Sequence, residues 1–561
     1  MKNLIPAALG NEPADLLFKN ATLFNPFNCE WEETSVAVKN GYVVGIGEYR
    51  ALKEIELGGS KVIPGLIDSH VHIESSLLTP VEYGRLVLKH GTTTVVADPH
   101  EIANVAGLCG LEYMLKEREE SLLDILYMVP SCVPASAKDM GGAILEAEDL
   151  KLFVGMKDIP GLAEMMNVPG VLAGDPGVWD KLELFDIIDG HAPLLRGKEL
   201  NAYILAGIQS DHECTELDEA REKLRRGMYI MMREGSTERN LKTLIPLVNA
   251  YTVSRCSFAT DDRHADMLLY EGHIDDCIRK AISYGLEPEL AYRMATLSAA
   301  ERFSLQDRGA VAPGKLADFC VIDDSNGFEV KKTFKRGVEY IDPGYIPRSP
   351  LERQFCSAPI TINSLKIKGK GRAHVIGLIQ DQILTENQII ELDSGEIPDI
   401  KRDILKLVVC DRYRGTGCGL GLVHGFGLKR GAIACSVSHD SHNIVAVGVT
   451  DKEIIRAVSE VVNNNGGMVM VLGDEVTTLP LECAGLMSIL PCEEVVSGFE
   501  RLKMKVAEMG GAGNPFMYLS FLALTVIPSL RLTERGVFDV VQFTDVPLFL
   551  EYTDSDRTPH P

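Results

Sequence analysis

The middle of the chain alternates short apolar runs with longer amphipathic segments. The apolar runs read VIPGLID, TTTVVAD, ILYMVPS, FDIIDGH, MYIMMRE and CSFATDD, and segments such as TPVEYGRLVLKHG and EGHIDDCIRKAISYG carry helical spacing between them. This alternation is typical of βα units around a parallel sheet. The 191 residues from residue 70 to residue 261 give about 27 residues for each of seven repeats, which fits a (β/α)8 barrel of ~250 residues. A doubly wound sheet has the same alternation and stays open at this point.

The two flanks of this middle segment have a different texture. Residues 14–62 contain short alternating β runs with Asn40-Gly41 placed as a hairpin turn, and a similar texture returns at 309–323. We therefore expect a small composite β-sandwich domain from residues 1–62 with 304–350, and the barrel at 63–303. Residues 351–561 mix strand-like runs such as ILKLVVCD with the helical KEIIRAVSEVVNNNGG, and are expected to form an additional α+β domain. The predicted fold class is α/β.

Charge and cysteine content narrow the choice of partners. The 561 residues carry a net charge of -24, which repels phosphate backbones and anionic membrane surfaces. We expect a small-molecule substrate and a homo-oligomer, with no nucleic acid and no membrane as partner. The 13 cysteines contain no C-x-x-C pair, which indicates neither a disulfide framework nor a zinc ribbon and fits a reducing cytoplasm. The apolar stretch 516–527 is too short to span a bilayer.

Histidines and an aspartate follow several of the apolar runs. His70 and His72 are two residues apart, so in an extended segment both imidazoles point the same way and can reach one metal ion. His191, His212 and Asp261 end or follow later runs, and catalytic groups of barrel enzymes gather at the carboxyl ends of the strands. Four histidines and an aspartate at one rim predict a metal site.

A pair of metal ions also needs a bridging anion. Lys157 can bridge only after carboxylation, and an exposed charge is the interpretation we favour for it. Glu164 lies in the apolar stretch GLAEMMNVPGV, where a carboxylate without a partner is costly to bury. A metal partner explains Glu164 better than solvent does, so it is the predicted bridging ligand.

Other polar residues lie at the same predicted rim and have two interpretations each. They can orient ligands, contact substrate or hold an additional metal, or they can be turn caps and ion pairs. These residues are Asp98, His100, Glu101, Glu213, Arg233 and Asp262, with Glu234, Arg263 and His264 beside them. In the C-terminal region, His439 and His442 flank Asp440 and give a weak metal or substrate signal, against a favoured interpretation as a solvated loop.

Taken together, these motifs resemble the amidohydrolase superfamily and, within it, the adenine deaminases of bacteria and archaea. The resemblance covers nearly the whole chain and includes a C-terminal domain that most amidohydrolases lack. It is carried by the segments PGLIDSHVHIESS, ADPHEIANVAG, GLAEMMNVPGV, DGHAP, SDHECT, REGS, TDDRH, SVSHDSHNI and GAGNPFMYLSFLAL. Leu194 stands where that pattern has a glycine after DGHAP.

The resemblance implies two divalent metal ions, manganese or iron, with zinc as a further option. His70 and His72 would hold one ion, His191 and His212 the other, and Glu164 would bridge them. It also implies hydrolytic deamination of adenine to hypoxanthine and ammonia. The catalytic residues would be Asp261, as the proton shuttle, together with Glu164 and His212.

Two alternatives stay open. Another amidohydrolase, acting on a cyclic amide or an N-acetyl amino sugar, would use the same ligands, and a carboxylated Lys157 would favour the cyclic-amide class. A non-catalytic barrel scaffold is a minor alternative. It predicts missing ligands, whereas all six ligand positions here hold competent residues.

Overall fold

The computed structural model describes residues 1–561 except 137, 381, 383, 394–396, 512 and 551–561. The chain divides into two compact units. The first unit contains residues 1–100, 111–132 and 145–347, and the second contains 101–110, 133–144 and 348–561. The sequence placed a domain boundary at residue 350, close to where the last long segment of the second unit begins. The two short segments that leave the barrel region for the second unit were not expected.

The first unit contains a closed ring of short parallel strands between residues 66 and 261. In chain order these are β6 (Leu66–Val71), β7 (Thr92–Ala97), β8 (Asp124–Tyr127), β9 (Leu162–Met165), β10 (Ile188–Gly190), β11 (Ser210–Asp211), β12 (Tyr229–Arg233) and β13 (Cys256–Ala259). Neighbouring strands pair in parallel, and a backbone hydrogen bond from Gln209 N to Ile188 O (3.1 Å) connects β10 to the start of β11. A parallel bridge between Val71 and Asp261 joins the last strand to the first. The predicted barrel is thus confirmed, because a doubly wound sheet leaves its end strands unpaired.

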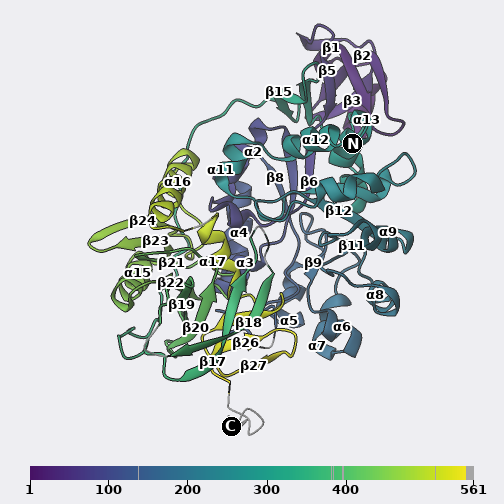
Figure 1. Ribbon diagram of the computed structural model, residues 1–561. Helices are drawn as coiled ribbons and strands as arrows, with labels where there is room; N and C mark the ends of the chain where they lie inside the picture. Colours follow the sequence, from purple (N-terminus) through teal and green to yellow (C-terminus); the bar gives the residue numbers. More distant parts are fainter. Residues whose placement is uncertain (137, 381, 383, 394–396, 512, 551–561) are drawn as a thin grey trace, which may run out of the picture. The chain divides into compact units, whose positions relative to one another are not determined.

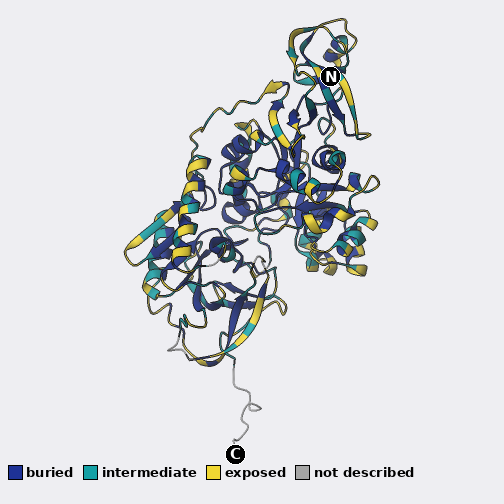
Figure 2. Cartoon of the chain, turned by 45° about the horizontal axis from the view of Figure 1, so that its top comes forward, coloured by how far each residue is buried: buried dark blue, intermediate teal, exposed yellow. Residues whose placement is uncertain are grey.

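Helices cover the outside of this ring (Figure 1), among them α2 (Pro80–Lys89), α8 (Gly197–Leu205), α9 (Leu217–Arg225) and α12 (Ile274–Ser283). Every residue of β6 and β7 is buried, as expected for parallel strands that are covered on both faces. Figure 2 shows the exposed residues on outer helices and loops. Polar side chains at the ends of such strands are out of contact with water and need partners.

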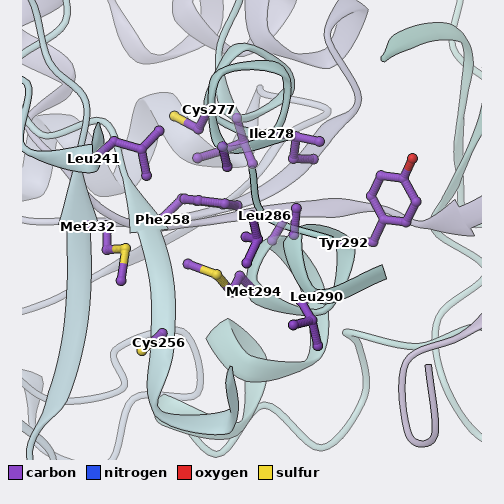
Figure 3. Packing of buried hydrophobic residues seen from close by; sticks show 14 of the residues in the cluster. Met232, Leu241, Cys256, Phe258, Cys277, Ile278, Leu286, Leu290, Tyr292 and Met294 are labelled. Carbon is purple, nitrogen blue, oxygen red and sulfur yellow. The ribbon is translucent and has the colours of Figure 1, made fainter. Parts of the chain in front are cut away.

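A hydrophobic cluster holds the last two strands in place. Figure 3 shows Phe258 of β13 and Met232 of β12 packed with Leu241, Ile278 and Met294, and all five side chains are fully buried. Close packing of this kind fixes the strands that it contacts. It therefore fixes the ends of β12 and β13, which carry Arg233 and Asp261.

The segments before and after the barrel join in one sheet. Its strands are β1 (Ala14–Asn25), β2 (Glu30–Lys39), β3 (Tyr42–Ile46), β4 (Ala51–Glu56), β5 (Lys61–Pro64), β14 (Phe319–Asp323), β15 (Glu329–Lys335) and β16 (Val338–Glu339). Antiparallel pairing of β5 with β14 connects the two segments. The predicted hairpin turn is confirmed, because Asn40 and Gly41 both have positive φ, 52° and 77°, between β2 and β3.

The second unit is built on a mixed sheet with the strand order β18, β17, β20, β19, β22, β21, β23, β24. These strands are β17 (Lys370–Leu378), β18 (Thr385–Asp393), β19 (Ile404–Cys410), β20 (Cys418–His424), β21 (Ala432–Cys435), β22 (Ile444–Gly448), β23 (Gly467–Leu472) and β24 (Glu475–Pro480). Helix α15 (Asp451–Asn463), capped by the Thr450 side chain, buries Ile454, Val458 and Val461 on one face.

Two expectations about the chain as a whole are tested by the structure. Cys410 and Cys418 lie opposite each other on β19 and β20 and form a disulfide, although the cysteine spacing indicated no disulfide framework. Their spacing matches no cysteine motif, so the pairing depends on the strand register alone. Among the described residues, no helix has both the length and the apolar character needed to cross a membrane.

Candidate metal centre

The six predicted ligands converge at the carboxyl ends of the barrel strands. His70 and His72 are at the end of β6, and Glu164 is in β9. His191 follows β10, His212 follows β11, and Asp261 follows β13. Exposure is 4% or less for all of these residues except His191, whose side chain is 16% exposed.

Glu164 lies between two pairs of histidines. Its Oε1 is 3.3 Å from His72 Nε2 and 3.9 Å from His70 Nε2, whereas its Oε2 is 2.6 Å from His191 Nδ1 and 3.1 Å from His212 Nε2. Each carboxylate oxygen thus faces a different histidine pair. A bridging ligand between two ions must offer its oxygens in this way.

Asp261 completes the donor set on the side of His70 and His72. Its Oδ1 is 3.0 Å from His72 Nε2 and 3.5 Å from His70 Nε2. The residue has a φ of 53°, in the left-handed region that costs a non-glycine residue about 1–2 kcal/mol. Backbone hydrogen bonds from Asp261 N to His70 O (3.0 Å) and from His72 N to Asp261 O (3.2 Å) hold it there. Strain of this kind is typical of functional sites.

Hydrogen bonds and charges prepare the donors for a cation. His72 Nδ1 donates to the carbonyl oxygen of Asp98 at 2.9 Å, which leaves the Nε2 lone pair facing the cluster. Burial would raise the pKa of Glu164, but His191 and His212 hold it well below its usual range. Burial would likewise raise the pKa of Asp261, and Arg233 with His70 and His72 holds it well below its usual range. Both acids are therefore carboxylates at neutral pH.

These donors fit a divalent cation. Groups of three of them, such as His70, His212 and Asp261, offer ligand atoms within 4.8 Å of one another. Imidazole nitrogens together with carboxylate oxygens suit manganese, iron and zinc.

Asp98 and His100 lie beside the same cluster. Asp98 accepts from the His100 backbone N–H (3.1 Å), which is the turn cap that the sequence offered as one interpretation. It also accepts from His100 Nδ1 at 3.1 Å, and that nitrogen is 3.5 Å from Glu164 Oε1. The structure thus brings His100 next to the predicted bridging carboxylate.

The remaining rim candidates separate into two groups. Arg233 contacts both Glu213 and Asp261, and Ser75 donates to Asp262, so these polar groups stay at the cluster. Glu234 instead pairs with Lys280 at 3.0 Å, and Arg263 pairs with Asp276, which is on α12. Lys157 is exposed, in agreement with the favoured interpretation of it.

Glu101, His439 and His442 meet in the second unit, although more than 330 residues separate them in sequence. The two histidines are 6% and 1% exposed, so the favoured interpretation of a solvated loop was wrong. Ser438 N donates to His442 Nδ1 at 3.2 Å, which places the ring hydrogen on Nε2, facing Glu101. Burial lowers the pKa of His442, against the effect of Glu101, so this imidazole is a neutral donor.

Sequence reasoning missed a buried lysine close to the loops that carry His191 and His212. Lys223 of α9 is fully buried and contacts Asp211 and Glu219. Asp68 accepts from the backbone N–H groups of His70 and Thr260, both at 3.2 Å. Lys223 carries no motif, whereas Asp68 begins the DSHVH segment that contains His70 and His72. A charged residue on a helix is more often solvated than buried, so the sequence gives no reason to expect that Lys223 is enclosed.

Comparison with known proteins places the chain in a family. Residues 61–339 match the amidohydrolase family, and residues 382–544 match the adenine deaminase C-terminal domain. Adenine deaminase of Methanoregula boonei is 59% identical over 552 residues, 98% of each chain. That of Methanoculleus marisnigri is 62% identical over 92% of this chain and 99% of its own, and that of Dehalococcoides mccartyi is 44% identical over 98% and 99%.

The closed barrel with a buried cluster of histidines and carboxylates at its strand ends defines the class: the chain is an amidohydrolase, and the donor set indicates a divalent metal site. The sequence is 44–62% identical, over nearly its full length, to proteins named adenine deaminase, which identifies the family within this class. The chain belongs to the adenine deaminase family.

Proposed function

We propose that this protein hydrolyses adenine to hypoxanthine and ammonia with two divalent cations. The observation that carries the substrate is the near-full-length identity to proteins named adenine deaminase, which extends through the C-terminal domain that bears the family's name. The observation that carries the reaction class is Glu164, whose two oxygens face two different histidine pairs.

The ligand assignment follows from these contacts. His70 and His72 would hold one cation, His191 and His212 the other, and Glu164 would bridge them. Asp261 would join the first pair through Oδ1. Manganese or iron is our choice, with zinc a further option, because the donors are imidazole and carboxylate. When bound, such cations lower the pKa of water enough to supply hydroxide at neutral pH.

Asp261 would move the protons. Water adds its oxygen to C6 of adenine, a ring nitrogen accepts a proton, and the amino group leaves as ammonia. An ionised carboxylate can take the proton of the attacking water and return it to the leaving amino group. The low pKa of Asp261 keeps it in this accepting form before each turnover.

The polar groups around the ligands would orient them or contact the purine. Asp98 would fix His72 and His100, and Glu213, Arg233 and Asp262 line the side nearest Asp261. Glu101 stays a predicted site residue, and its contacts are with His439 and His442.

Another amidohydrolase activity is less well supported. A cyclic-amide hydrolase with a carboxylated lysine would need Lys157 at the cluster, but Lys157 is exposed and Glu164 lies between the two histidine pairs. A non-catalytic scaffold would not need six converging donors, five of them buried, with ionised carboxylates. The homo-oligomer and the cytoplasmic location stay predictions; sedimentation of the purified protein tests the first.

The test is a substrate comparison with manganese-loaded protein. Adenine, hydantoin and N-acetylglucosamine 6-phosphate are supplied in separate reactions. In the reaction with adenine, the release of ammonia and the formation of hypoxanthine are measured. We expect turnover of adenine alone, lost on chelation and in Asp261→Asn. Turnover of hydantoin or the amino sugar, with none of adenine, would move the protein to another amidohydrolase activity. Turnover of none would support the scaffold.

A further inference from the structure

Arg233 lies at the end of β12, the strand between those that lead to Glu213 and Asp261. Strand β12 pairs with β11 on one side and β13 on the other. Glu213 follows β11 and Asp261 follows β13 by two residues each. One long side chain at the middle strand can therefore reach both acids.

The guanidinium of Arg233 contacts both carboxylates. Its Nη1 donates to Asp261 Oδ2 at 2.6 Å and to Glu213 Oε1, and its Nη2 donates to Glu213 Oε2 at 3.3 Å. All three residues are 5% exposed or less. Hydrogen bonds between charged groups are shorter and stronger than neutral ones, and the planar fork of arginine fixes the direction of each. We name this set of Glu213, Arg233 and Asp261 the arginine clamp.

The clamp makes the two oxygens of Asp261 different. Oδ2 is held by Arg233, whereas Oδ1 faces His72 and His70 at 3.0 and 3.5 Å. A carboxylate that is free to rotate would offer either oxygen to the cluster. With the Arg233 guanidinium on Oδ2, only Oδ1 is directed toward the two histidines.

We propose that Arg233 is a positioning residue that holds Asp261 so that Oδ1 alone faces His70 and His72, with Glu213 anchoring the other edge of the guanidinium. This inference rests on the proposed function for the reaction, but the placement of Asp261 does not depend on the substrate. Arg233 would act through Asp261, because its Nη1 donates to Asp261 Oδ2 and its two Nη groups both donate to Glu213.

The test compares four manganese-loaded proteins: wild type, Arg233→Lys, Arg233→Met and Arg255→Met. Arg255 is the matched control, because it is exposed at the opposite end of β13, beside Tyr229. A misplaced catalytic group can lower the rate about 100-fold. We therefore expect Arg233→Met to lose about that factor in kcat, with the KM for adenine unchanged, while Arg255→Met keeps the wild-type values.

Two further readouts separate positioning from general damage. In a fifth protein, Arg233→Ala, added guanidinium ion should restore part of the lost kcat, since it can occupy the space between the two carboxylates. A crystal structure of manganese-loaded Arg233→Met, or of Arg233→Lys if the methionine variant does not fold, should show the Asp261 carboxylate rotated from its wild-type direction.

Three results would overturn the inference. The first is a raised KM with kcat unchanged, which would make Arg233 a substrate-binding residue. The second is a kcat in Arg233→Met equal to that of the control. The third is an Asp261 carboxylate that keeps its direction in the variant structure. If wild-type protein fails to turn over adenine, the proposed function fails, and the crystal structure still decides the placement of Asp261.

Discussion

The substitution Lys223→Met tests whether the buried charges beneath the metal ligands stabilise the barrel. Lys223, Asp211 and Glu219 have fully buried side chains. Lys223 Nζ is 2.6 Å from Glu219 Oε1, 3.1 Å from Asp211 Oδ2 and 2.6 Å from the carbonyl oxygen of Ala192. Asp211 precedes His212 and Ala192 follows His191, so one ammonium group joins the loops that carry two predicted ligands.

The expected loss of stability follows from the charge that is left behind. Burial would lower the pKa of Lys223, and Asp211 raises it above its usual value, while Lys223 in turn lowers the pKa of Asp211. Methionine fills a similar volume but leaves two carboxylates buried without their cation. Breaking a buried ion pair in this way costs about 3–5 kcal/mol. At roughly 2 °C per kcal/mol for a large unit, we expect the melting temperature to fall by roughly 8 °C.

The assay is thermal unfolding of chelated protein, so that metal binding does not add to stability. Arg225→Met is the matched control, because Arg225 is exposed on the same helix. The double variant Lys223→Met/Glu219→Gln should recover part of the loss, since it removes one uncompensated charge. An ion pair at the protein surface contributes at most about 1 kcal/mol. If Lys223→Met lowers the free energy of unfolding by less than that, the reasoning is refuted.

Three further predictions concern other positions. Glu164→Gln should retain at most one tightly bound cation per chain, because an amide offers one acceptor oxygen; metal analysis after dialysis checks this, and two retained ions would contradict it. Burial raises the pKa of Asp139 to about 7, so its native form holds a proton that the unfolded chain releases above about pH 4, and stability falls as pH rises from about 4 to about 7. The free energy of unfolding of Asp139→Asn, measured in urea, should therefore rise relative to that of wild type over that interval, by up to about 4 kcal/mol. A difference in unfolding free energy that does not change with pH would count against a raised pKa. Leu194 has a φ of 60°, so Leu194→Gly should stabilise the protein by about 0.5–1 kcal/mol, while Leu205→Gly at the exposed end of α8 should destabilise it by about 1 kcal/mol; equal effects would refute the strain at Leu194.

The sequence predicted the residues that a strand-end rule can locate. His70 and His72 are found by their spacing in an extended segment, and His191, His212 and Asp261 by their place after apolar runs. Glu164 is found because a lone carboxylate in an apolar stretch needs a partner. The structure brings all six together because parallel strands of a closed barrel end at one rim.

Other features depend on distances that no local pattern encodes. Glu101 meets His439 and His442 across more than 330 residues, and the disulfide between Cys410 and Cys418 depends on the register of two strands. Residues 101–110 and 133–144 group with the C-terminal segment for the same reason. The buried Lys223 is a further case, since helical periodicity shows which face is apolar but not which charge is enclosed with its partners.

The central claim is that two cations, held by this donor set, drive the deamination of adenine. It is tested most directly by titrating chelated protein with manganese while bound metal and the rate of hypoxanthine formation are measured on the same samples. We predict that both rise together and level off at two manganese ions per chain. Full activity at one ion per chain, or turnover of adenine that continues in chelated protein, would contradict the account.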